Sequence, residues 1–157
     1  MSKKPISECD DAADKAIAVM TGAIVGEALL PAHVNWAIAA TTMGAGVVAI
    51  GLAYDVKLTK DEAWKLVKQF FLAAGFCFIA LNIGSKIFAM VIESTGIGYM
   101  AGVALDCTIS GAAAWAIGSC AREYFRRDYL GQGKPSTKEL GEIFRQKFRQ
   151  KKSDLKK

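Results

Sequence analysis

"STGIGYMAGVALDCTISGAAAWAIGSCA", residues 94–121, is the stretch that decides how this 157-residue chain folds. It holds 28 residues and a single formal charge, that of Asp106. About 20 apolar residues are enough for a helix to cross a bilayer. Gly, Ala and Ser recur here in place of large apolar side chains, which also suits a tightly packed helix within a soluble bundle. Both interpretations predict a helix, and they differ in what surrounds it.

The rest of the chain has helical periodicity and no alternating strand pattern. Helices are predicted over residues 11–30, 32–54, 86–92 and 97–129, with a further helix starting at Lys60 and a last one after Ser136. The fold class is therefore all-α, a bundle of four to five glycine-rich apolar helices plus a basic amphipathic C-terminal helix. Residues 1–10 are predicted to be disordered, 11–130 to form the helical domain and 131–157 to be a basic linker and amphipathic tail. Asp10 or Asp11 is expected near the first N-cap.

Two helix starts carry a specific local signal. Thr59 is followed three residues later by Glu62, and Ser136 by Glu139 in the same way. This spacing is a capping box, in which the hydroxyl accepts from the backbone amide of the acid and the carboxylate accepts from that of the cap residue. Thr59 and Glu62 are therefore predicted to fix the start of the helix at Lys60.

Glycines at helical spacing predict close contacts between helices, because a residue without a side chain lets another backbone approach. A glycine inside a helix costs about 1 kcal/mol relative to alanine, so a packing reason is expected for each one. The second and fifth predicted helices are expected to pair as a tight hairpin. The predicted packing residues are Gly22, Gly26, Gly98, Gly102, Gly111 and Gly118.

Charge is concentrated at the C-terminal end. Residues 134–157 hold nine Lys or Arg against three acids, whereas the first 133 residues are close to neutral. Such an arm suits an anionic membrane surface, nucleic acid or an acidic protein. Phe144 and Phe148 lie at helical spacing rather than in an RNA-binding pattern, so a helix lying on anionic lipid is favoured over nucleic acid. The residues expected to bind that surface are Arg145, Lys147, Arg149, Lys151 and Lys152.

Few residues indicate chemistry. Glu27 and Asp106 are acids inside apolar helices, and each is either paired or at a wet edge of its helix. His33 is the only histidine, and the four cysteines lack metal-site spacing, so they are expected to be buried thiols of a reducing compartment. The sequence "GQGKPST" departs from a phosphate-binding loop at both ends. No secretory signal peptide, cofactor, metal site or catalytic residue is predicted.

Two segments together resemble a known family. They are "YDVKLTKDEAWKLV" at 54–67 and "GIGYMAGVALDCTISGAAAWAIGSCAREYF" at 96–125. Their order and separation resemble domain-of-unknown-function family 697, a helical bacterial domain associated with Era-like GTPases. The entry to the second predicted helix, "LLPAHVN", departs from the family by having a single proline and a histidine. The resemblance implies a helical fold and association with a membrane or a GTPase, and it carries over no catalytic residues.

The function expected from these observations is a non-enzymatic membrane-associated module that anchors or serves a GTPase partner. It is expected at the bacterial cytoplasmic membrane with its tail in the cytosol, alone or as an oligomer. Two alternatives stay open: a pore-forming or permeability-altering membrane protein, and a soluble cytoplasmic helical domain that binds a lipid or another apolar ligand.

Overall fold

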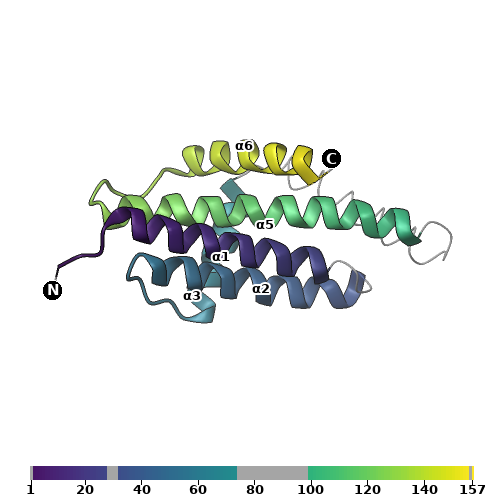
Figure 1. Ribbon diagram of the computed structural model, residues 1–157, viewed down its shortest axis with the longest axis horizontal. Helices are drawn as coiled ribbons and strands as arrows, with labels where there is room; N and C mark the ends of the chain where they lie inside the picture. Colours follow the sequence, from purple (N-terminus) through teal and green to yellow (C-terminus); the bar gives the residue numbers. More distant parts are fainter. Residues whose placement is uncertain (1, 28–31, 74–98, 156) are drawn as a thin grey trace.

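The computed structural model describes residues 2–27, 32–73, 99–155 and 157, without the side chains of 32–37, 39, 40, 71, 99–107 and 109. These residues form the helices α1 (Ile6–Glu27), α2 (Ala32–Ala53), α3 (Lys60–Ala73), α5 (Tyr99–Tyr129) and α6 (Thr137–Leu155), as Figure 1 shows. No described residue lies in a strand, so the predicted all-α class is confirmed. The helix predicted over residues 86–92 lies outside the described residues.

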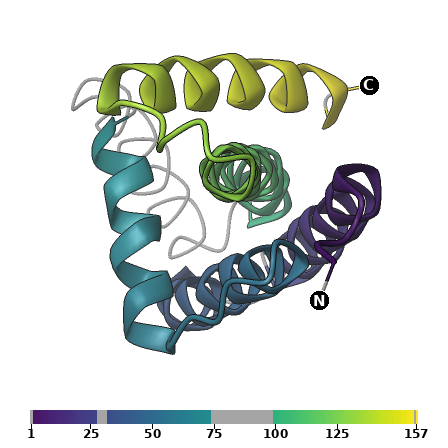
Figure 2. The same cartoon turned by 90° about the vertical axis from the view of Figure 1, so that its left-hand side faces the viewer.

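Helix α5 is the centre of the bundle. Viewed along its axis, α6 lies on one side of it, α1 and α2 lie on the other, and α3 crosses beside them (Figure 2). Between Ser110 and Ala121 every α5 side chain is buried except those of Trp115 and Ser119, which are half-buried. Most of these residues are Ala or Gly, which lets α1 and α6 approach closely. The part of the opening stretch from Ser110 to Ala121 is thus covered by the protein's own helices.

Helix α1 begins earlier than predicted. The structure places Ile6 at its first turn, where the carbonyl oxygen of Pro5 accepts hydrogen bonds from the amides of Glu8 and Cys9. Cys9 is only 1% exposed, so tertiary contacts hold this turn in place. The prediction of disorder through residue 10 is therefore wrong for residues 6–10, and Asp10 lies inside the helix rather than at its N-cap.

Asp10 instead joins three helices at one end of the bundle. Its carboxylate accepts hydrogen bonds from the Tyr54 hydroxyl at 2.6 Å and from Arg126 Nε at 3.1 Å, and Arg122 lies 3.8 Å away. Burial favours the neutral carboxyl group, but these hydrogen bonds and positive charges outweigh it, so the pKa of Asp10 lies below its ordinary value. Burial, together with the bond to Asp10, raises the pKa of Tyr54.

Helix α6 is part of the folded core. Leu140 and Phe144 are fully buried and Phe148 is 3% exposed, all against the rest of the bundle. An α6 glycine, Gly141, lies so close to the carbonyl of Ala73 at the end of α3 that no side chain fits between them. The predicted division into a helical domain at 11–130 and a separate tail at 131–157 is therefore wrong as a description of packing.

One long side of the bundle is apolar and exposed. Its largest side chains are Val19 on α1, 72% exposed, and Ile38 and Leu52 on α2, 37% and 49% exposed. Ala45 and Ala49 are exposed along α2 between them. In the described part of the chain, no helix has both the length and the apolar character needed to cross a membrane. The interpretation of residues 94–121 as a membrane-crossing helix has no support from that part.

Candidate functional site

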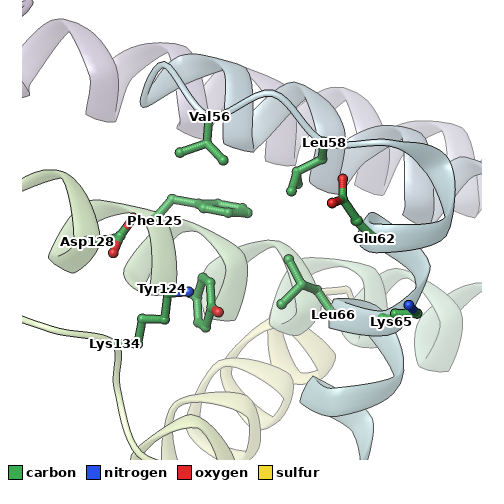
Figure 3. A pocket seen from close by; sticks show the side chains of 9 residues that line it. All are labelled: Val56, Leu58, Glu62, Lys65, Leu66, Tyr124, Phe125, Asp128 and Lys134. Atoms are coloured by element: carbon green, nitrogen blue, oxygen red, sulfur yellow. The ribbon is translucent and has the colours of Figure 1, made fainter.

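A shallow groove lies where the chain passes from α2 to α3 and meets the last turns of α5 (Figure 3). It has a volume of about 250 Å³. Apolar and aromatic side chains form its floor, and charged groups stand along its rim. The lining residues are Val56, Leu58, Glu62, Lys65, Leu66, Tyr124, Phe125, Asp128 and Lys134.

The turn that forms one wall of the groove is held by its backbone. The amide of Val56 donates to the carbonyl of Gly51 at 2.9 Å, and Asp55 has a positive φ of 61°. A side chain at Gly51 would stand 3.1 Å from the carbonyl oxygen of Val56 and 3.2 Å from Leu58. A side chain at Gly51 would therefore force its neighbours to shift by a few tenths of an ångström, and the left-handed residue of this turn is Asp55, a type that tolerates this conformation. Its carboxylate is paired with Lys4 at 3.0 Å.

The predicted capping box is confirmed at the start of α3. The backbone amide of Thr59 donates to Glu62 Oε2 at 2.8 Å, and the amide of Glu62 donates to the Thr59 hydroxyl at 3.2 Å. The bond from the Thr59 amide, with that from its hydroxyl, lowers the pKa of Glu62 below its ordinary value. Glu62 thus has two tasks, since it fixes the first turn of α3 and stands on the rim of the groove.

The other capping box, at the start of α6, is also confirmed. The Ser136 amide donates to Glu139 Oε2 at 2.7 Å, and the Glu139 amide donates to the Ser136 hydroxyl at 3.2 Å. Arg127 of α5 donates to Glu139 Oε1 at 2.9 Å. The hydrogen bonds that Glu139 accepts from the Ser136 backbone amide and from Arg127 lower its pKa to about 2. This contact fixes the linker that carries Lys134 to the groove.

Aromatic stacking orders the opposite wall. The Tyr124 ring packs edge-on against Phe125 and Phe70, with centroid separations of 5.4 and 6.0 Å. The ammonium group of Lys134 lies 5.0 Å from the centre of the Tyr124 ring, a cation–π distance. Phe125 is only 2% exposed, so its ring closes the bottom of the groove.

The groove can bind, but its lining residues do not indicate a reaction. They include no Ser, Cys or His, and the acids Glu62 and Asp128 come with the two lysines Lys65 and Lys134. Within the described residues, no group of three or more His, Cys, Asp or Glu side chains is placed to hold a metal ion. An apolar floor with a rim of both charge signs suits an amphipathic segment of a partner molecule.

The predicted packing glycines divide into groups. A side chain at Gly118 would stand 2.8 Å from Ile17 of α1, and one at Gly111 would stand 2.7 Å from Val25, so both lie at close α1–α5 contacts. At the exposed Gly22 and Gly26 an added side chain would meet no described atom within 4 Å, so the predicted close contact is absent from the described residues. The expected seam between the second and fifth helices is thus an α1–α5 seam. Gly98 and the surroundings of Gly102 lie outside the described residues.

Of the two acids predicted within apolar helices, Glu27 has a described side chain. Glu27 ends the described part of α1 and is half-buried, and its Oε1 accepts a hydrogen bond from the hydroxyl of Thr42 at 2.5 Å. Its Oε2 is buried and accepts no hydrogen bond from a described group. Asp106 lies in α5, and its side chain is outside the described set.

The five basic residues predicted to bind an anionic surface are on the second half of α6. Arg145 and Arg149 are exposed, whereas Lys147, Lys151 and Lys152 are half-buried. The ammonium group of Lys151 lies 4.4 Å from the centre of the Trp115 ring on α5. Cys9 and Cys120 are free and buried, as predicted; Cys77 and the side chain of Cys107 are outside the described set. Burial raises the pKa of the Cys120 thiol to about 12.

The groove unites the two segments that carry the family resemblance. Val56, Leu58 and Glu62 come from the first segment, and Tyr124 and Phe125 come from the second. Lys65 and Leu66 also come from the first segment, whereas Asp128 and Lys134 lie outside both segments. The sequence did not show that these residues meet. Only the chain path shows that the linker after α5 returns to the start of α3.

Comparison of the chain with protein-family models finds no match, and searches of curated proteins and of solved structures find no significant similarity. The resemblance to family 697 therefore stays a prediction from the residues quoted above. The class of protein that the fold defines is an all-α helical bundle.

Proposed function

We propose that this chain is a non-enzymatic, membrane-associated helical module that holds a partner protein in the groove between α3 and α5, and that the partner is an Era-like GTPase. The observation that carries the proposal is the meeting of both resemblance segments at one exposed, amphipathic groove (Figure 3).

The composition of the groove supports a protein partner. Leu58, Leu66 and Phe125 offer an apolar floor, which can anchor one or two side chains of a partner. Lys65 and Lys134 offer donors at the rim, where charges govern orientation and the rate of association more than affinity. The GTPase identity rests on the resemblance alone. The membrane association rests on the basic face of α6.

The test measures, by calorimetry, the binding of the purified full-length chain to an Era-like GTPase. The GTPase is loaded either with a non-hydrolysable GTP analogue or with GDP. Leu66→Ala removes part of the groove floor and should weaken binding at least about fivefold, as for an interface anchor. Leu72→Ala is the matched control, because Leu72 is on the same helix, is 71% exposed and does not line the groove.

Thermal melts of both variants establish that each remains folded. The proposal fails if neither nucleotide form of the GTPase binds, or if a folded Leu66→Ala chain binds as tightly as wild type.

A further inference from the structure

We infer that α6 binds the surface of an acidic bilayer through charge alone, without inserting an apolar side chain into it. The inference rests on the proposed membrane association and names the element, the ligand and the manner of binding. Residues 145–152 contain five basic residues and no acid. Such a run beside an anionic leaflet is attracted by its surface potential.

The exposed Arg145 and Arg149 and the half-buried Lys152 form one row. Arg145, Arg149 and Lys152 are spaced i, i+4 and i+7, so they share a side of the helix, over about 10 Å of its axis. The outermost positions next to this row are Gln146, Gln150 and Ser153, which are exposed and uncharged. No acid lies among residues 145–153, and the nearest acids in sequence are the exposed Glu142 before this row and the exposed Asp154 after it. Lys151 is drawn back toward Trp115 and contributes less.

The apolar side of α6 is already used by the fold. An amphipathic helix that lies in a bilayer buries its large apolar residues at the boundary between headgroups and acyl chains. Here Phe144 is fully buried, Phe148 is 3% exposed, and the two rings stack at 6.2 Å within the core. Exposing them to lipid would require α6 to leave α5. Membrane binding by the folded protein must therefore lack the insertion component.

An acidic bilayer fits this surface better than nucleic acid does. A flat, continuous field of negative charge needs no side-chain geometry. Single-stranded nucleic acids add stacking on exposed aromatic rings, and duplexes are read by side chains that reach base edges. The outward side of residues 145–153 carries Gln and Ser beside its cations, while its aromatic rings face inward. This surface therefore offers positive charge but no outward aromatic rings on which bases could stack.

The test is co-sedimentation of the full-length chain with vesicles of phosphatidylcholine alone and of phosphatidylcholine with phosphatidylglycerol. The triple variant Arg145→Gln, Arg149→Gln, Lys152→Gln keeps good helix formers and should bind acidic vesicles on the order of 10- to 100-fold more weakly. Its matched control, Lys15→Gln, Lys57→Gln, Lys60→Gln, removes the same charge from exposed positions elsewhere and should bind like wild type. Arg145→Lys with Arg149→Lys should also bind like wild type, because only charge is required.

Salt separates charge from insertion. Binding to acidic vesicles should fall steeply between 0.05 and 0.5 M salt, where the Debye length shrinks from more than about 10 Å to a few ångströms. Neutral vesicles, including small and highly curved ones, should not bind. Retention in high salt, binding to neutral vesicles, equal loss in the control variant, or tighter binding to a DNA duplex than to acidic vesicles would each overturn the inference.

Failure here can be told from failure of the proposed function. The folded Leu66→Ala chain should bind acidic vesicles like wild type, since the groove does not include α6. If a folded chain binds acidic vesicles but no GTPase, the proposed partner is wrong and the inference about α6 stands. If it binds the GTPase but not the vesicles, the inference about α6 is wrong and the proposed groove stands.

Discussion

Asp10 shows how much one side chain can contribute when three helices meet on it. Asp10→Asn removes the negative charge that Arg126 and Arg122 face and weakens the bond from Tyr54. Hydrogen bonds to charged groups contribute roughly 1.5–3 kcal/mol, so the free energy of unfolding at pH 7 should fall by about that amount in urea denaturation. Asp11→Asn, at an exposed neighbouring position, should change it by less than about 0.5 kcal/mol.

The pH dependence of this effect has a definite sign. The pKa of Asp10 is lower in the folded state than its ordinary value of 3.8. Its stabilisation is therefore fully present above the unfolded-state pKa and is lost as the pH falls through the folded pKa. The difference between wild type and Asp10→Asn should shrink steadily below about pH 4. A difference that stays constant down to pH 2 would show that the lost bond, and not the charge, accounts for it.

Two glycines predicted to play the same part should respond in opposite ways. Gly22→Ala should raise the free energy of unfolding by up to about 1 kcal/mol, because the new methyl meets no described atom and alanine favours the helix. Gly118→Ala places a carbon 2.8 Å from Ile17, and overpacking of this kind costs about 1–3 kcal/mol. Thermal melts of both variants and of wild type measure these changes. A Gly118→Ala chain more stable than wild type would mean that α1 and α5 pack less closely than described.

The helices themselves could be predicted where a signal is local. Thr59 with Glu62, and Ser136 with Glu139, mark helix starts because the residues that bond are three apart in sequence. The first turn of α1 carries no such signal. It is held by burial of Cys9 and by Asp10, whose partner Arg126 is 116 residues distant. The groove escaped prediction for the same reason, since its two walls are more than 50 residues apart.

Helix α6 shows the limit of periodicity at the scale of an element. Phe144 and Phe148 do share one side of the helix, as their spacing predicts, but such spacing does not say whether lipid or protein covers that side. Phe144→Ala should cost about 3–5 kcal/mol, the usual loss for a buried phenylalanine. Truncation after Leu130 should abolish the cooperative thermal transition seen by circular dichroism, because it uncovers one side of α5. A truncated chain that melts like wild type would show that α6 is an independent tail.

At the scale of the whole molecule, the charged and the apolar surfaces are on different sides. Figure 2 shows α6 on one side of α5 and the α1–α2 pair on the other. A rigid bundle cannot lay both on the same flat bilayer. If α6 is the contact, the exposed apolar side with Val19 and Leu52 points away from the lipid, and the groove lies between the two surfaces, open to a partner.

The orientation of the bundle on the bilayer can be determined by adding the same negative charge to the α6 side or to the α2 side. Gln146→Glu with Gln150→Glu places two acids on the outer surface of α6, and Ala45→Glu with Ala49→Glu places two on the exposed side of α2. Both pairs change the net charge equally, and all four positions are exposed. We expect the α6 pair to reduce co-sedimentation with acidic vesicles at least about tenfold, since like charge opposes the surface potential where distances are shortest. The α2 pair should have little effect, because its charges stand about a bundle's width from the bilayer. If the α2 pair instead abolishes binding while the α6 pair does not, the apolar side faces the membrane and the molecule lies the other way up.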